Sequence, residues 1–179
     1  MAPPHRPVLI QINRAPVLTL WAAVVAERLG FDWQEALTLG RVVAGLNAYT
    51  KGRALGLFHP KPADVKVKRD KLRNGEALTV NLLHRAVPVT QTPSGLRALS
   101  KDRPIPPDSV ERYLQTKFGE DYSAAKSAMT TLARAYTPAV LAERAYALYE
   151  AFRPDVPAGT AGWGAAGVLD LERVLELTK

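Results

Sequence analysis

The chain has 179 residues, of which 47% are hydrophobic and 23% charged, a composition typical of a folded globular protein rather than a disordered or fibrous one. It has no cysteine, which excludes a disulfide framework and thiolate metal sites, and its histidines at positions 5, 59 and 84 lie too far apart to indicate a histidine metal site. The remaining bulk signal is a formal net charge of +7.

Two helical parts flank a middle third that is rich in basic residues and short alternating runs. This order predicts a mainly helical α+β fold with an N-terminal helix pair, a central basic β-hairpin region, and a C-terminal three-helix bundle followed by a short terminal helix. We expect two regions, residues 1–105 and residues 106–179, which can also form one compact domain.

The first helix is predicted over residues 16–30, because Pro16 suits a first helical position and Gly30 supplies a stop. Its apolar residues form one stripe at helical spacing: Val17, Leu20, Trp21, Val24, Val25 and Leu29. This spacing favours a core helix over a secretory signal, and no apolar run reaches the roughly 20 residues that span a bilayer. We therefore expect a cytoplasmic protein that does not contact a membrane.

A second helix is predicted to begin at a capping box, Asp32 with Glu35, and to run to about Ala48.

Small residues recur at every fourth position of this second helix, at Ala36, Gly40 and Ala44. A helix-interior glycine costs about 1 kcal/mol relative to alanine, so we attribute Gly40 and Gly45 to close packing against a neighbour. That neighbour is either the first helix or a second copy of the chain, which would make a homodimer through Ala36, Gly40 and Ala44.

The middle third contains two hairpin patterns. Val65 and Val67 alternate with lysines, Asn74-Gly75 is a strong turn signal, and residues 78–82 alternate again, which predicts a hairpin with a basic outer face. Residues 86–90 and 96–99 around a turn at 92–95 predict a second hairpin, in which Pro88 marks an edge strand.

Three further helices are predicted after residue 106. Asp108 and Glu111 are expected to cap the first helix, which ends at Gly119. Tyr122 begins the apolar stripe of the second helix, and Pro138 is the expected start of the third. A short terminal helix follows from Asp170.

The positive charge is concentrated in residues 51–74, which carry a net charge of +6. A localised basic stretch is typical of phosphate-backbone binding, although a solvated surface has the same composition. The candidate phosphate contacts are Lys51, Arg53, Lys66, Lys68, Arg69, Lys71 and Arg73.

Residues 25–32 resemble the turn of bacterial helix-turn-helix proteins, with a small residue four positions before the turn glycine and a polar cap after it. That family places its second helix in the DNA major groove, and the outward candidates here are Gln34, Thr38 and Arg41. An ordinary antiparallel helix pair explains the same residues, and Asp32 and Glu35 put negative charge where phosphates would lie.

Residues 13–21, residues 45–52, and residues 148–154 with Gly162-Trp163-Gly164 resemble a family of bacterial proteins of about this length that carries no assigned function. The resemblance covers nearly the whole chain. It implies a stand-alone protein and transfers no active site.

These observations favour a non-enzymatic protein that binds nucleic acid, with DNA the first expectation, through phosphates along the basic stretch. We identify no catalytic residue, metal site or cofactor motif. The alternatives are a homodimeric interaction module and, third, an enzyme acting on an anionic small molecule.

The Asn74-Gly75 turn is testable through the free energy of unfolding. A β-branched residue resists positive φ, so Gly75→Val should destabilise the protein by about 1–3 kcal/mol. An unchanged thermal midpoint of unfolding would contradict the predicted turn.

Overall fold

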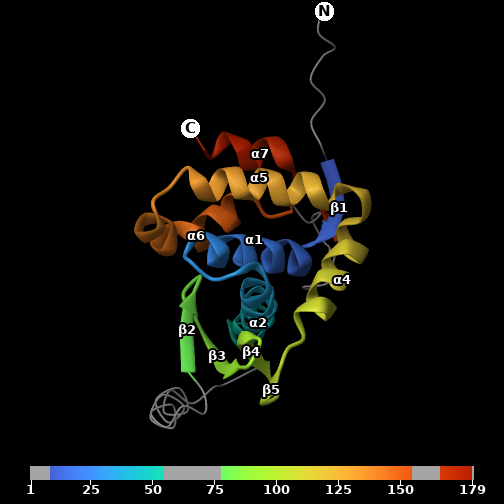
Figure 1. The fold of residues 1–179 in the computed structure, drawn as a ribbon. Helices are drawn as coiled ribbons and strands as arrows, with labels where there is room; N and C mark the ends of the chain where they lie inside the picture. The colour runs from blue at the N-terminus through green and yellow to red at the C-terminus, as the bar shows by residue number, and fades with distance from the viewer. Residues whose placement is uncertain (1–8, 55–77, 155–165, 179) are drawn as a thin grey trace, which may run out of the picture.

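A computed structural model describes residues 9–54, 78–154 and 166–178. The predicted fold class is confirmed: the molecule is a mainly helical α+β protein with two small antiparallel sheets. In Figure 1, α1 (Arg14–Arg28) crosses the middle of the molecule, α5 (Tyr122–Arg134) and α7 (Leu171–Glu176) lie above it, and α2 (Trp33–Ala54) and the larger sheet lie below.

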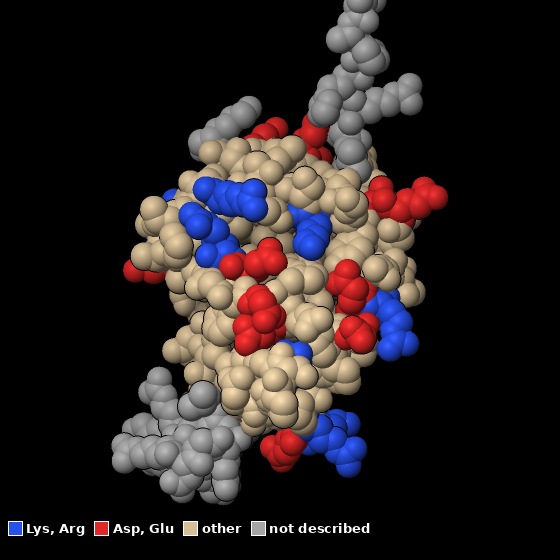
Figure 2. All heavy atoms as spheres, viewed as in Figure 1, with Lys and Arg blue, Asp and Glu red and all other residues tan. Residues whose placement is uncertain are grey.

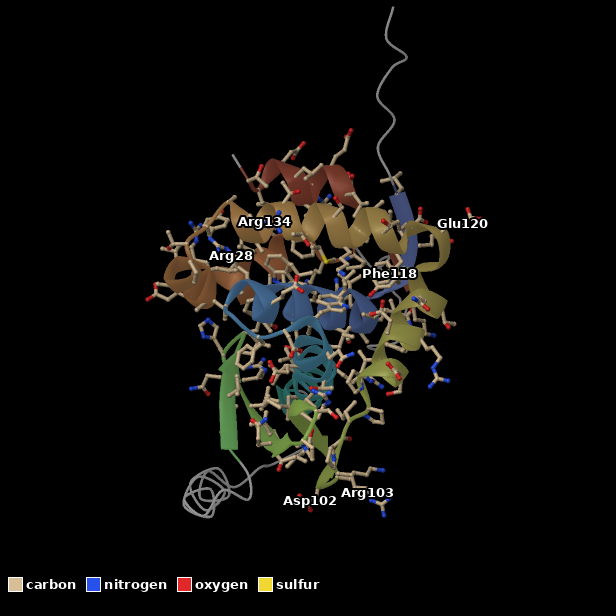
Figure 3. All side chains as sticks on the ribbon, in the orientation of Figure 1. Arg28, Asp102, Arg103, Phe118, Glu120 and Arg134 are labelled. Carbon is tan, nitrogen blue, oxygen red and sulfur yellow. The ribbon has the colours of Figure 1, made fainter. Side chains whose placement is uncertain are left out.

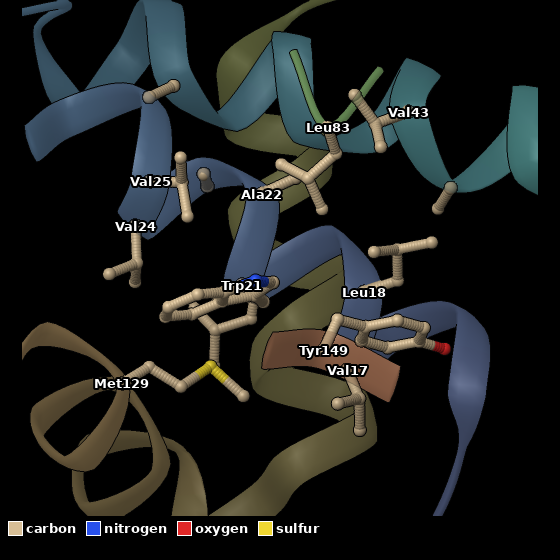
Figure 4. Packing of buried hydrophobic residues seen from close by; sticks show 14 of the residues in the cluster. Val17, Leu18, Trp21, Ala22, Val24, Val25, Val43, Leu83, Met129 and Tyr149 are labelled. Carbon is tan, nitrogen blue, oxygen red and sulfur yellow. The ribbon is translucent and has the colours of Figure 1, made fainter. Parts of the chain in front are cut away.

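The central helix α1 is buried on every side. Residues 16–26 are all buried, so the buried surface includes the expected apolar stripe and is wider than it. The residues between the stripe positions are also apolar or small, and a helix that is apolar all round is enclosed by its neighbours. Met129 of α5 and Tyr149 of α6 (Pro138–Phe152) lie beside α1 in Figure 4, and the indole N–H of Trp21, a residue of α1 itself, donates to the carbonyl oxygen of Ala145 at 2.9 Å.

The second helix α2 begins at the predicted capping box. The Asp32 carboxylate accepts from the Glu35 backbone N–H at 2.8 Å, and the Glu35 carboxylate accepts from the Asp32 N–H at 3.0 Å. The helix continues to Ala54, six residues past the predicted end at Ala48.

The helices α1 and α2 cross at Gly40. A Cβ atom added there would lie 2.9 Å from the Ala23 backbone nitrogen and closer still to the Thr19 carbonyl oxygen. Ala36 and Ala44 on the same ridge are buried as well. The ridge therefore packs on α1 of its own chain, and the expected homodimer through Ala36, Gly40 and Ala44 is corrected, because no surface remains there for a second copy.

The larger sheet is a meander of β2 (Leu78–Leu82), β3 (Arg85–Thr92), β4 (Gly95–Ser100) and β5 (Arg103–Pro104), in that order. The hairpin of β3 and β4 confirms the second predicted hairpin. The Asn74-Gly75 turn and its strand around Val65 and Val67 lie outside the described residues; the described partner of β2 is β3, joined through a two-residue turn at Leu83-His84.

Pro88 lies in β3, an interior strand, so its prediction as an edge-strand marker is wrong. Pro88 is opposite Thr79 of β2, whereas the pairing of β3 with β4 ends at Val89 and Ala98. In an antiparallel ladder, hydrogen-bonded and non-hydrogen-bonded pairs alternate. Counting from the hydrogen-bonded Leu82–Arg85 pair that closes the turn, the Pro88–Thr79 pair is a non-hydrogen-bonded one. The Pro88 nitrogen therefore points away from β2, to the side where the pairing with β4 has ended. The missing N–H therefore costs the sheet no hydrogen bond.

The three C-terminal helices are α4 (Pro107–Phe118), α5 and α6 (Pro138–Phe152); all three pack on α1, and α4 also packs on α2. The expected cap of α4 by Asp108 and Glu111 is wrong, because Pro106 is the N-cap residue and no side chain caps this helix. The Glu111 carboxylate instead accepts hydrogen bonds from the Trp33 indole at 3.2 Å and the Tyr122 hydroxyl at 2.8 Å. It thus joins α2, α4 and α5.

A second sheet pairs β1 (Leu9–Asn13) with β6 (Ala166–Asp170) in antiparallel register, and the sequence did not indicate it. Asp170 ends β6 and, as predicted, opens the terminal helix, because its carboxylate accepts from the Glu172 N–H at 3.0 Å. One hydrophobic core includes residues from both sides of the expected boundary between residues 105 and 106, Leu18 and Leu132 among them.

Within the part of the chain that the structure describes, no helix has the length and apolar content needed to cross a membrane.

Because α1 and α2 cross at Gly40 and not at Gly45, alanine substitutions of these two glycines should change the free energy of unfolding in opposite directions. Gly40→Ala forces the two backbones apart and should destabilise the protein by about 1–3 kcal/mol. Gly45→Ala is the matched control, because nothing lies within 4 Å of its added Cβ, and it should stabilise the helix by up to about 1 kcal/mol. Urea unfolding of both variants measures the difference, and equal stabilities would contradict the close crossing.

Candidate nucleic-acid interface

The net positive charge lies almost entirely outside the described side chains. Residues with described side chains carry 14 basic and 13 acidic groups, and the rest of the chain carries 10 basic and 4 acidic groups. Figure 2 shows one face of this nearly neutral body, with blue and red groups both present. An electrostatic interface must therefore draw most of its charge from the remaining residues.

The sequence-predicted phosphate contacts fall into two groups. Lys51 and Arg53 belong to the last turns of α2, where the structure describes the backbone. The others lie outside the described residues: Lys66, Lys68, Arg69, Lys71 and Arg73.

The three residues expected on an outward face of α2 do not share one. Gln34 and Arg41 are exposed, but Thr38 is fully buried. The Thr38 hydroxyl donates to the Glu35 carbonyl at 2.9 Å and accepts from the Ala98 N–H at 3.0 Å, while the Glu35 carboxylate accepts from the Leu96 N–H at 2.9 Å.

These two side chains of α2 therefore bind the edge of β4 that the short strand β5 leaves unpaired. Thr38 is unavailable to a nucleic acid, and the sheet covers the part of α2 that a recognition helix would insert into the major groove.

Arg41 is exposed and lies against an aromatic ring. Its guanidinium carbon lies 4.7 Å from the centre of the Tyr113 ring on α4. Burial raises the pKa of the Tyr113 hydroxyl and the Arg41 charge partly opposes this, so the phenol stays neutral and the contact is a cation–π interaction.

Arg41 borders a hollow of about 330 Å³ between α2 and the strands β3 and β4, here termed the α2–β4 hollow. Its apolar lining consists of Val42, Leu46, Pro88, Leu99 and Ile105. Its polar side chains are Arg41, Ser100 and Lys101. An apolar lining with cations beside it suits an anionic molecule that also has an apolar part.

Gly45 opens this hollow. It is exposed inside α2, and a Cβ built on it meets nothing within 4 Å, so close packing does not explain it as it explains Gly40. A helix-interior glycine at an exposed position costs about 1 kcal/mol relative to alanine. What the glycine provides is open space beside Arg41.

Lys101 is presented by a two-residue turn between β4 and β5 in which Lys101 has φ 52° and Asp102 has φ 64°. Both residues are in the left-handed region, where glycine and asparagine are favoured and lysine is not. The turn lies at the far end of the molecule from Arg28 and Arg134, as the labelled Asp102 and Arg103 show in Figure 3. A cation thus occupies a strained position beside the α2–β4 hollow.

The end of α2 that leads to Lys51 is fixed by Asn47. The amide oxygen of this residue, which is only 6% exposed, accepts from Arg85 Nη2 and from the Tyr146 hydroxyl, both at 3.0 Å. The Arg85 guanidinium also lies over the Tyr146 ring at 5.4 Å. These contacts join α2, β3 and α6 one turn before Lys51.

A second pair of cations, Arg28 and Arg134, which are labelled in Figure 3, borders a smaller hollow of about 210 Å³ at the ends of α1 and α5. Arg28 Nη2 donates to the Tyr136 carbonyl oxygen at 3.1 Å, which occupies it in joining helix ends. Glu27 borders the same hollow and reduces its positive potential. We therefore favour the α2–β4 hollow as the binding feature.

Sequence reasoning missed Gly45 and Lys101 as site residues. The one available signal was a helix-interior glycine, and attributing both Gly40 and Gly45 to packing hid the difference between them. Lys101 has no sequence signal, because its position depends on a turn that lacks glycine.

The buried role of Thr38 predicts a stability effect. Thr38→Val keeps the shape but leaves the buried Ala98 N–H without its acceptor, so the protein should lose about 1–3 kcal/mol in urea unfolding. Thr131→Val is the control, because this exposed threonine only donates to the Ser127 carbonyl, and it should change stability by less than about 0.5 kcal/mol. An outward, nucleic-acid-contacting Thr38 would show the reverse: unchanged stability with weaker binding.

No family model, curated protein or solved structure matches this chain.

Proposed function

We propose that this protein binds nucleic acid through phosphates, using the basic residues 51–74 carried on a nearly neutral body, and that it catalyses no reaction. The observation that carries the proposal is the separation of charge: a body with 14 basic and 13 acidic side chains, and a segment of net +6. Each cation set against a phosphate releases condensed counterions, so a concentrated basic segment binds phosphate backbones without sequence readout.

The described body supports this proposal by anchoring the segment at both ends. The chain leaves the body along α2, fixed by Asn47, and returns into β2, whose Leu82 is 2% exposed. The elements on both sides of the segment are thus ordered in the free protein, and binding does not have to order them.

Insertion of α2 into the DNA major groove is not part of the proposal. Glu35 and Thr38 are occupied by their hydrogen bonds to β4, and the sheet lies against α2. Phosphate contacts position a protein on a nucleic acid without base readout, so the basic segment requires no recognition helix.

Salt dependence tests the proposal. Changing Lys66, Lys68, Arg69 and Lys71 together to Gln should weaken binding to random duplex. The slope of log K against log salt should fall by about one unit for each of these cations that neutralises a phosphate in the wild-type complex. Fluorescence anisotropy at several salt concentrations measures both quantities.

The control removes the same charge from the body, by changing Arg112, Lys117, Arg134 and Arg144 to Gln. It should leave the slope nearly unchanged if the phosphates bind the segment. An equal decrease of affinity and slope in both variants would mean that net charge alone, and not the segment, determines binding. A wild-type protein that binds no nucleic acid at low salt would refute the proposed function.

A further inference from the structure

We propose that the α2–β4 hollow takes one unpaired nucleotide, so that the protein prefers a single strand to a duplex. The inference rests on the proposed function and adds to it the class of nucleic acid. It is carried by three features: an apolar hollow of about 330 Å³, cations on its border, and an open glycine in its wall.

The apolar lining suits the flat face of a base. Val42 and Leu46 come from α2, and Pro88, Leu99 and Ile105 come from the opposite side. Base faces are apolar and base edges are polar, so a base in the hollow contacts these side chains through its faces and meets Ser100 at its edge.

The cations suit the phosphate of the same nucleotide. Arg41 lies against the Tyr113 ring and brings its charge to the border of the hollow. Lys101 reaches the same hollow from the β4–β5 turn, in a backbone conformation that disfavours lysine.

The hollow connects to the basic segment through α2. Gly45 and Leu46 lie in the helix that continues to Lys51 and Arg53, so a strand bound at this end of α2 has its neighbouring nucleotides near the hollow. In a duplex the bases are stacked inside and only phosphates and groove edges are presented. Only an unpaired base can enter, which selects a single strand.

Filling the hollow tests the inference. The probe is a labelled single-stranded oligonucleotide of about 12 nucleotides, compared with its duplex, within the site sizes common for single-strand binding. Gly45→Leu occupies the open space at a position that tolerates a helix-forming residue. Its affinity for the single strand should fall by about 5- to 100-fold, the value of one bound base, with duplex affinity unchanged.

Two further variants complete the test: one removes a proposed phosphate contact, and the other controls for the added leucine side chain. Lys101→Asn suits the positive φ and removes the charge, and it should lower the single-strand salt slope by about 0.7. Ala142→Leu adds the same side chain at an exposed position of α6, away from the hollow, and should leave the single-strand affinity unchanged. Thermal unfolding of each variant verifies that it folds.

The outcomes distinguish this inference from the proposed function. Equal wild-type affinity for single strand and duplex, or an unaffected Gly45→Leu variant, overturns the single-strand inference and leaves phosphate binding by the segment in place. A mononucleotide that binds as tightly as the oligonucleotide also overturns it, because the occupant would then be a free nucleotide. Failure to bind either nucleic acid refutes the proposed function itself.

Discussion

The burial of α1 is the constraint on which the rest of the structure depends. Residues 16–26 are enclosed on every side, by α2 below, by α5 and α6, and by α4 at the end. A helix without a solvent face must be covered by elements from the whole chain, and this is why the N-terminal pair and the C-terminal helices share one core. The crossing at Gly40 is the closest of these contacts, because backbone meets backbone there.

That crossing fixes α2, and α2 in turn fixes the sheet. Glu35 and Thr38 hold the β4 edge, and Asn47 holds the start of β3 through Arg85. Glu35 and Thr38 before this stretch of the helix and Asn47 after it therefore stabilise the fold. The exposed residues between them, Arg41 and Gly45, line the hollow together with β4 and Lys101. The described body has little net charge, whereas residues 51–74 carry a net charge of +6.

The sequence predicted what local chemistry determines. The Asp32–Glu35 box, the helix starts at Pro138 and Asp170, and the β3–β4 hairpin were all confirmed, because each depends on a few neighbouring residues. Errors came where distant contacts decide. Thr38 is buried because β4 lies on it, Pro88 is interior because the β4 pairing stops short of it, and the β1–β6 sheet joins segments that no local signal connects. The same holds for the candidate site, because the sequence does not show that Gly45 and Lys101 line the same hollow.

The most direct test is an amide chemical-shift titration of the isotope-labelled protein with a single-stranded oligonucleotide at low salt. The account predicts that the largest shifts fall in residues 51–74 and at Gly45, Leu46 and Lys101, with Arg28 and Arg134 unaffected. Shifts centred on the α1 and α5 ends around Arg28 and Arg134, or no shifts under conditions where electrostatic attraction is strongest, would contradict it.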